Sequence, residues 1–154
     1  MRLIAGATLL VSGALVLVAQ ACANPAATEP LPEAGSLEDF VEGAQPVLAA
    51  RCASPTCHGS PERPLSLYAP RRYRIDPART WVDEPLTEDE LWHNYWQTAV
   101  FLEGIEHAPE SLLLLLPLSA RAGGAGHADT DVFLDTGDWD YRRLSSWIEA
   151  VLAG

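Results

Sequence analysis

The stretch "RCASPTCHGSPERPLSLYAP", residues 51–70, contains two cysteines, Cys52 and Cys57, that are separated by four residues, and His58 directly follows the second. Three kinds of site use thiols and a histidine at such short spacing: a covalently attached haem, a zinc site and, with the thiols alone, a disulfide. Each of these three sites would require a different arrangement of the surrounding residues. The interpretation of this stretch therefore decides which fold and which function the rest of the sequence supports.

A haem attached through two thioethers needs two thiols for its vinyl groups and a histidine beside the second thiol to bind iron, as in the run C-x-x-C-H. Here the run is C-x-x-x-x-C-H, with "ASPT" between the thiols. The additional residues can bulge outward, and Pro55 suits such a turn. Cys57 and His58 remain adjacent, which fixes the iron ligand relative to one thioether. We therefore expect Cys52 and Cys57 to attach haem c and His58 to be its proximal iron ligand.

Two alternatives remain open for the same residues. In an oxidising compartment, Cys52 and Cys57 could form a small disulfide, and the chain would then be a haem-free, disulfide-closed binding module. Cys52, Cys57 and His58 could instead be three zinc ligands. The fourth ligand would then come from a distant part of the chain, although structural zinc sites usually combine two paired clusters.

The start of the chain is typical of a secretory signal. Met1 and Arg2 precede an apolar run from residue 3 to residue 18 that contains two glycines, and "AQAC" at 19–22 supplies small residues at a cleavage position. The run is short and interrupted for a membrane-spanning helix. We expect residues 1–21 to be a signal peptide, with a retained N-terminal membrane anchor as the alternative.

Cys22 is predicted to carry a lipid. "VAQAC", residues 18–22, resembles the bacterial lipobox, in which a small residue precedes the cysteine that is acylated and becomes the new N-terminus. The chain has three cysteines, and an odd cysteine in a secreted protein needs an explanation. Lipidation of Cys22 would leave Cys52 and Cys57 as a matched pair. We expect an exported protein on the periplasmic side of a bacterial membrane, lipid-anchored at Cys22, although simple cleavage without lipidation remains open.

Residues 22–35 are rich in Ala, Pro and Glu and show no periodicity, which predicts a flexible linker. We expect residues 36–154 to form a single domain. Without residues 1–21 the chain has nine arginines, no lysine and 21 acidic residues, which gives a net charge of −12. Such a chain repels nucleic acid and anionic lipid surfaces. A redox protein partner is therefore expected to present a basic surface.

Helical signals predict an all-α domain of about three helices with long loops around a haem. Ser36 can cap a first helix that Pro46 kinks or divides and that ends just before Cys52. Thr87 and Glu90 form a capping box for a second helix over 87–104. Asp140 is predicted to cap a third helix that runs to the C-terminus.

The predicted core comes from the apolar faces of these helices. In the first helix the face holds Phe40, Ala44, Val47 and Leu48, and in the last it holds Tyr141, Leu144, Trp147, Ile148, Val151 and Leu152. Trp92, Tyr95 and Trp96 of the middle helix are expected in the core. A short buried turn is expected between Pro109 and Pro117. Long loops in so small a domain usually enclose something, and a large apolar cofactor would complete the core.

The sixth iron ligand is expected to be a histidine, because the only methionine is Met1, which leaves with the signal. His127 lies in the glycine-rich loop "AGGAGHADT", which can approach a haem face, and it is the first candidate. His93, beside Trp92 on the middle helix, is the second. His107 stands directly before Ala108-Pro109 and is expected to be a loop residue. An open iron position, as in a haem enzyme or gas sensor, remains an alternative.

Arg71, Arg72 and Arg74 are the only basic cluster of the chain. They are candidate partners of haem propionates, because guanidinium groups pair with carboxylates through two parallel hydrogen bonds. A solvated loop is the alternative.

Three segments together resemble the cytochrome c family: "QPVLAARC" (45–52), "CHG" (57–59) and "YRRLSSWIEAVL" (141–152). Residues 109–152 are more narrowly similar to cytochrome c-like domains of predicted bacterial secreted proteins. In these a "P-x-S-x-L-L-x-x-P-L" stretch precedes a histidine loop and a terminal "Y-x-x-L-x-x-W-I" helix. This chain departs from them where Ala128-Asp129-Thr130 replaces three glycines, and residues 61–108 have no match.

The resemblance implies that the first and last helices cross and that His58 binds iron. It also implies a histidine at the position of His127. The function that follows is that of a secreted single-haem electron carrier, not an enzyme.

Overall fold

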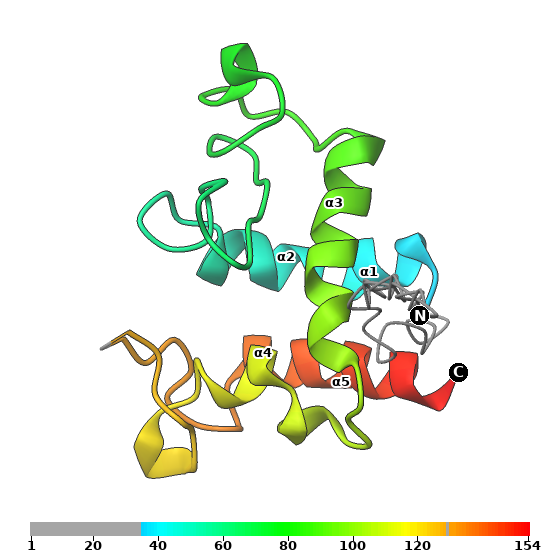
Figure 1. Ribbon diagram of the computed structural model, residues 1–154, viewed down its shortest axis with the longest axis vertical. Coiled ribbons are helices and arrows are strands. Elements are labelled where there is room, and N and C mark those ends of the chain that lie inside the picture. Colours follow the sequence, from blue (N-terminus) through cyan, green and yellow to red (C-terminus); the bar gives the residue numbers. More distant parts are fainter. Residues whose placement is uncertain (1–34, 129) are drawn as a thin grey trace, which may run out of the picture.

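The computed structural model describes residues 35–128 and 130–154. They contain five α-helices: α1 (Leu37–Gly43), α2 (Gln45–Val47), α3 (Glu88–Ala99), α4 (Leu112–Leu115) and α5 (Trp139–Ala153). The described part holds no β-strand, only one isolated bridge between Leu118 and Phe133. The all-α class is confirmed, with five helices in place of about three. Figure 1 shows α3 running across α1 and α5.

The predicted signal peptide (1–21), Cys22 and the linker up to residue 34 lie outside the described residues. Within the described ranges, no helix has the length and apolar character needed to cross a bilayer.

The first helical segment is divided at Pro46, as expected. The Ser36 hydroxyl accepts the Asp39 N–H at 3.1 Å and begins α1, which ends at Gly43, and α2 carries Pro46 in its first turn. The chain then widens into a π-helical turn, η1 (Leu48–Cys52), where the Ala53 N–H donates to the Leu48 carbonyl at 2.9 Å. The helix therefore includes Cys52 and does not end before it. Such wide turns often mark functional positions, and this one leads directly into the cysteine–histidine stretch.

The predicted capping box of α3 is confirmed. The Thr87 hydroxyl accepts the Glu90 N–H, and the Glu90 carboxylate accepts the Thr87 N–H at 2.9 Å. The helix ends at Ala99 and tightens into a 3₁₀ turn, η3 (Val100–Leu102). Gly104 follows with φ at +70°, a conformation that glycine adopts without strain.

Helices α1 and α5 meet closely at Gly43. A side-chain carbon at this position would lie 3.1 Å from Trp147. The Phe40 ring is fully buried and contacts both Trp147 and Tyr95, at 5.5 Å between ring centroids in each case. One aromatic ring of α1 therefore joins α3 and α5 into a common core.

Two expectations about the core helices are wrong. Asp138 caps α5, because its carboxylate accepts the N–H groups of Asp140 and Tyr141, so the helix begins at Trp139. Trp92 and Trp96 are 38% and 46% exposed and stack on each other at the surface of α3. The expected apolar faces of the first and last helices are buried, with Leu152 half-buried.

Three more short 3₁₀ turns complete the described structure: η2 (Pro77–Arg79), η4 (Ala108–Glu110) and η5 (Ala120–Ala122). The short buried turn expected between Pro109 and Pro117 is α4, with Leu113 and Leu114 in the core.

Candidate functional site

A cavity of about 570 Å³ separates the cysteine–histidine segment from the segment around α4 and the loop that follows it. Its lining is mainly apolar and comes from five stretches of the chain. These side chains are Leu48, Arg51, Cys52, Thr56, Cys57, His58, Arg63, Pro64, Leu65, Phe101, Leu112, Leu113, Leu116, Pro117, His127, Ala128, Thr130 and Val132. Four residues proposed from the sequence thus line a single cavity: Cys52, Cys57, His58 and His127.

The wall with the cysteines is a compact loop stabilised by its own backbone. The Ser54 carbonyl accepts the N–H groups of Cys57 and Gly59, each at 2.8 Å, and the Cys52 carbonyl accepts the His58 N–H at 3.1 Å. A side-chain carbon at Gly59 would lie 2.4 Å from the Ala53 carbonyl oxygen, so the turn requires glycine. Pro55 is exposed, as expected for residues that bulge away from the site.

Both cysteines are free thiols. Burial, together with the neighbouring Cys57, raises the pKa of the Cys52 thiol to about 12. This thiol is protonated at neutral pH, and a protonated thiol is a poor metal ligand because the thiolate is the form that binds.

His58 is oriented by its second ring nitrogen. Nδ1 donates to the Leu65 carbonyl at 2.9 Å, because a carbonyl can only accept, and Nε2 therefore carries the lone pair. Burial lowers the pKa of His58, with the nearby His127 and Arg63 acting in the same direction and the Leu65 hydrogen bond opposing them. At neutral pH the imidazole is uncharged, which is the form that binds a metal, and a carbonyl partner of this kind commonly orients metal-bound histidines.

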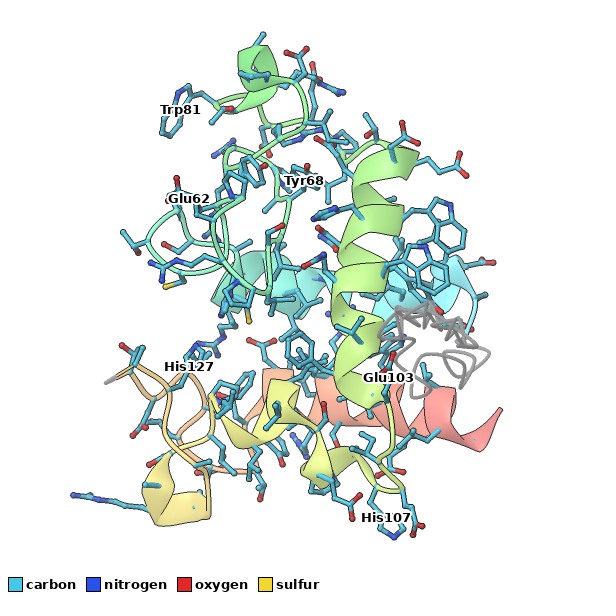
Figure 2. All side chains as sticks on the ribbon, in the orientation of Figure 1. Glu62, Tyr68, Trp81, Glu103, His107 and His127 are labelled. Carbon is cyan, nitrogen blue, oxygen red and sulfur yellow. The ribbon has the colours of Figure 1, made fainter. Side chains whose placement is uncertain are left out.

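His127 faces His58 from the opposite wall. The two ring centroids are 5.6 Å apart and the ring planes are inclined by 27°. Figure 2 shows His127 on the loop that follows α4, turned toward the segment that carries the cysteines. The Leu118–Phe133 bridge closes the base of this loop, where the Ser119 N–H donates to the Phe133 carbonyl at 2.9 Å. Residue 128, directly after the histidine, is an alanine with φ at +44°, a region that favours glycine.

The dimensions of this arrangement fit a haem. Bonds between a metal and an imidazole nitrogen are about 2 Å long, so two histidines on opposite sides of one metal have ring centres about 6 Å apart. A cavity of this size is in the range that encloses small-molecule ligands, and its apolar lining suits a porphyrin. Arg63 adds to the wall a positive charge of the kind that pairs with propionate groups, whereas Arg51 is already paired with Asp138 and Asp140.

Within the two described ranges, no three His, Cys, Asp or Glu side chains are grouped as a bare metal ion would require.

The second ligand candidate, His93, does not line this cavity. Its Nε2 lies 3.0 Å from both the hydroxyl and the carbonyl oxygen of Ser66, and its ring contacts Tyr68 at 4.6 Å between centroids. His107 stands at the far end of the molecule (Figure 2), just before η4, as a loop residue. Of the three histidines considered for the sixth position, the fold brings only His127 to His58.

The arginine cluster lies elsewhere too. Arg74 is buried against Glu90, Arg71 pairs with Asp83, and the Arg72 guanidinium donates to the Ala49 carbonyl at 2.6 Å. The propionate role considered for these three side chains has no support from their positions, because none of them lines the cavity.

Arg51 and Arg63, which line the cavity, were missed by the sequence reasoning. Arg51 pairs with Asp140 at 2.6 Å and Asp138 at 3.4 Å, and Arg63 donates to the Thr56 carbonyl at 3.2 Å. Clustering along the sequence pointed to Arg71, Arg72 and Arg74, which do not line the cavity. The closeness of Arg51 and Arg63 in sequence to the cysteine–histidine stretch could have indicated them, because Arg51 directly precedes Cys52 and Arg63 lies five residues after His58.

Comparisons with protein-family models, with curated proteins and with solved structures find no match to this chain. A functional assignment therefore depends on the residues of the site.

Proposed function

We propose that this protein is a secreted, single-haem c-type cytochrome that carries electrons. The observation that carries the proposal is the pair His58 and His127, which face each other at 5.6 Å across a cavity whose wall contains Cys52 and Cys57. The sequence resemblance to the cytochrome c family agrees with it.

Each residue of the site has a role in this proposal. Cys52 and Cys57 would hold haem c through thioethers, His58 would be the proximal iron ligand and His127 the distal one. Arg63 would neutralise propionate charge. When bound, the haem supplies an iron that accepts and releases one electron.

The chain's own contribution is to fix both ligands and to exclude water. The Leu65 carbonyl holds the His58 ring, and apolar side chains from η3 and α4 line the cavity. If His58 and His127 both bound the iron, no open coordination position would remain for a substrate or a gas. Two histidine ligands therefore favour an electron carrier over a haem enzyme or a gas sensor, and predict a lower reduction potential than a histidine–methionine pair.

Export and lipidation belong to the same proposal and are supported by the sequence alone. Mass spectrometry of the mature N-terminus should find acylated Cys22. An unmodified N-terminus in a soluble periplasmic fraction would contradict lipidation and leave the haem proposal intact.

The test of the haem proposal is covalent attachment in protein matured in a host that exports it and attaches haem c. Haem should remain with the protein after acid–acetone extraction and give a pyridine haemochrome spectrum. Cys52→Ser and Cys57→Ser should each lose one thioether and shift that spectrum, and the double variant should release the haem. Cys22→Ser is the matched control and should retain it. A disulfide between Cys52 and Cys57, or bound zinc, in the natively matured protein would refute the proposal.

A further inference from the structure

The loop that precedes α3 carries an exposed apolar tip. We call residues 70–86 the flap. Trp81 is 82% exposed, the highest exposure among the large hydrophobic side chains described, and Val82 is 38% exposed. Pro77 and Ala78 of η2 are exposed as well. Figure 2 shows Trp81 near one end of the molecule, well away from His127. The surrounding fold leaves this indole uncovered, although burial of a Trp side chain is strongly favourable.

The flap is rigidly attached to α3 in spite of its exposure. Arg74 is buried and donates two hydrogen bonds to the Glu90 carboxylate, at 2.9 and 2.8 Å, and further ones to the carbonyls of Glu84 and Pro85. Both ends of the flap are thereby tied to one guanidinium group. A tip on such a support loses little conformational entropy when it binds a surface.

The charges of the flap are balanced, in contrast to the rest of the chain. The flap contains four arginines and three acidic residues, Asp76, Asp83 and Glu84, whereas the mature chain has a net charge of −12. Arg71 pairs with Asp83 and Arg79 pairs with Glu84. The flap can therefore approach an anionic surface that repels most of this protein.

The two exposed tryptophans of α3 lie beside carboxylates. Trp92 and Trp96 stack on each other, and the Trp92 indole N–H lies 3.4 Å from the Glu88 carboxylate, beside Asp89. These carboxylates disfavour contact with an anionic bilayer.

The proposed lipid at Cys22 would hold the domain close to a bilayer. The 13 residue-to-residue steps from Cys22 to Gly35 can extend over at most about 45 Å. At the high effective concentration that such a tether creates, even a weak contact is populated. Tryptophan is the side chain most typical of the bilayer interface, because its ring prefers the headgroup level.

We propose that the flap tip, formed by Pro77, Ala78, Trp81 and Val82, contacts the bilayer interface and sets the orientation of the tethered domain. This inference rests on the proposed membrane tether and not on the proposed haem. It leaves the cavity, on the side marked by His127 in Figure 2, accessible to a partner.

The test uses the mature chain, tethered through an N-terminal histidine tag to phosphatidylcholine vesicles that contain a nickel-chelating lipid. The tag makes the test independent of lipidation. The ratio of tryptophan emission on brominated to unbrominated vesicles reports indoles at the interface, and it cancels quenching within the protein. We expect clear quenching in the parent chain and at least an approximately twofold loss of quenching in Trp81→Ser.

Trp139→Ser is the matched control, because Trp139 is 69% exposed on α5, away from the flap. It should keep the quenching of the parent chain. The proposal is overturned if the parent chain is not quenched, or if both variants lose quenching equally.

Discussion

At the scale of single residues, the backbone around His58 and His127 fixes where their rings lie. His58 is fixed because the Leu65 carbonyl occupies Nδ1, and burial keeps the ring neutral. His127 is placed by a loop in which the next residue, Ala128, has φ at +44°. A left-handed conformation costs a non-glycine residue about 1–2 kcal/mol. The ligand candidate is therefore held at a position where the backbone is strained.

Ala128→Gly should relieve this strain and stabilise the protein by up to about 1 kcal/mol, because glycine adopts this conformation freely but gains entropy in the unfolded chain. Denaturant unfolding of both proteins gives the difference. Ala150→Gly, at an exposed position of α5, is the control and should destabilise by about 1 kcal/mol. A loss of stability in both variants would show that residue 128 is not strained.

At the scale of elements, most features that depend on neighbouring residues could be predicted, although Asp138 and not Asp140 caps α5. Features that depend on contacts between distant segments could not. The capping box of Thr87 and Glu90 and the division at Pro46 could be predicted because they depend on residues a few positions apart. The exposure of Trp92 and Trp96 could not, because it depends on what packs against α3 from elsewhere. The partners of the arginine cluster could not be predicted for the same reason: Arg74 pairs with Glu90, 16 positions away.

The crossing of α1 and α5 is tested by Gly43→Ala. The added carbon would lie 3.1 Å from the buried Trp147, whereas alanine favours the helix over glycine by about 1 kcal/mol. Because Trp147 is held in the core, we expect the clash to outweigh this gain and to lower the free energy of unfolding by about 1 kcal/mol. In a Trp147→Ala background, which removes the Cγ and Cδ1 atoms but keeps Cβ, the same change should cost less, since part of the clash is gone. Equal effects in both backgrounds would mean that the two helices do not touch at this point.

The attachment of the flap to α3 predicts a dependence on pH. Burial acts to raise the pKa of Glu90, but hydrogen bonds from Arg74 and from the N–H groups of Thr87 and Ile75 outweigh it and lower the pKa to about 2. Because the folded pKa lies below the ordinary value of 4.5, the pair stabilises the fold above pH 4.5. This stabilisation is lost as the pH falls from 4.5 toward 2.

Glu90→Gln should therefore lower the free energy of unfolding at pH 7 by about 3–5 kcal/mol, because it leaves Arg74 buried without its partner. The difference from the parent chain should shrink at acidic pH. Glu84→Gln removes an exposed pair with Arg79 and should cost less than about 1 kcal/mol. A constant difference between pH 7 and pH 3 would contradict the role of the Glu90 carboxylate.

At the scale of the whole molecule, the net charge is −11 for the full sequence and −12 without the expected signal peptide, and it is expected to steer the encounter with charged partners. Reduction by a cationic donor such as hexaammineruthenium(II) should slow as salt rises, because the Debye length falls from about 30 Å at 0.01 M to about 10 Å at 0.1 M. Stopped-flow absorption measures the rate. Ascorbate, an anionic donor, should show the opposite trend. If the rates do not change with ionic strength, the acidic surface does not steer electron donors and contributes only to solubility.

The measurement that tests the central claim most directly is electron paramagnetic resonance, with absorption spectroscopy, of the oxidised and natively matured protein. Two imidazole ligands predict a low-spin iron in the parent chain. His127→Ala should convert it to high spin, whereas His93→Ala, which alters a residue outside the cavity, should leave the low-spin spectrum unchanged. A high-spin parent chain, or a His127→Ala variant that keeps the low-spin spectrum, would contradict an iron held between His58 and His127.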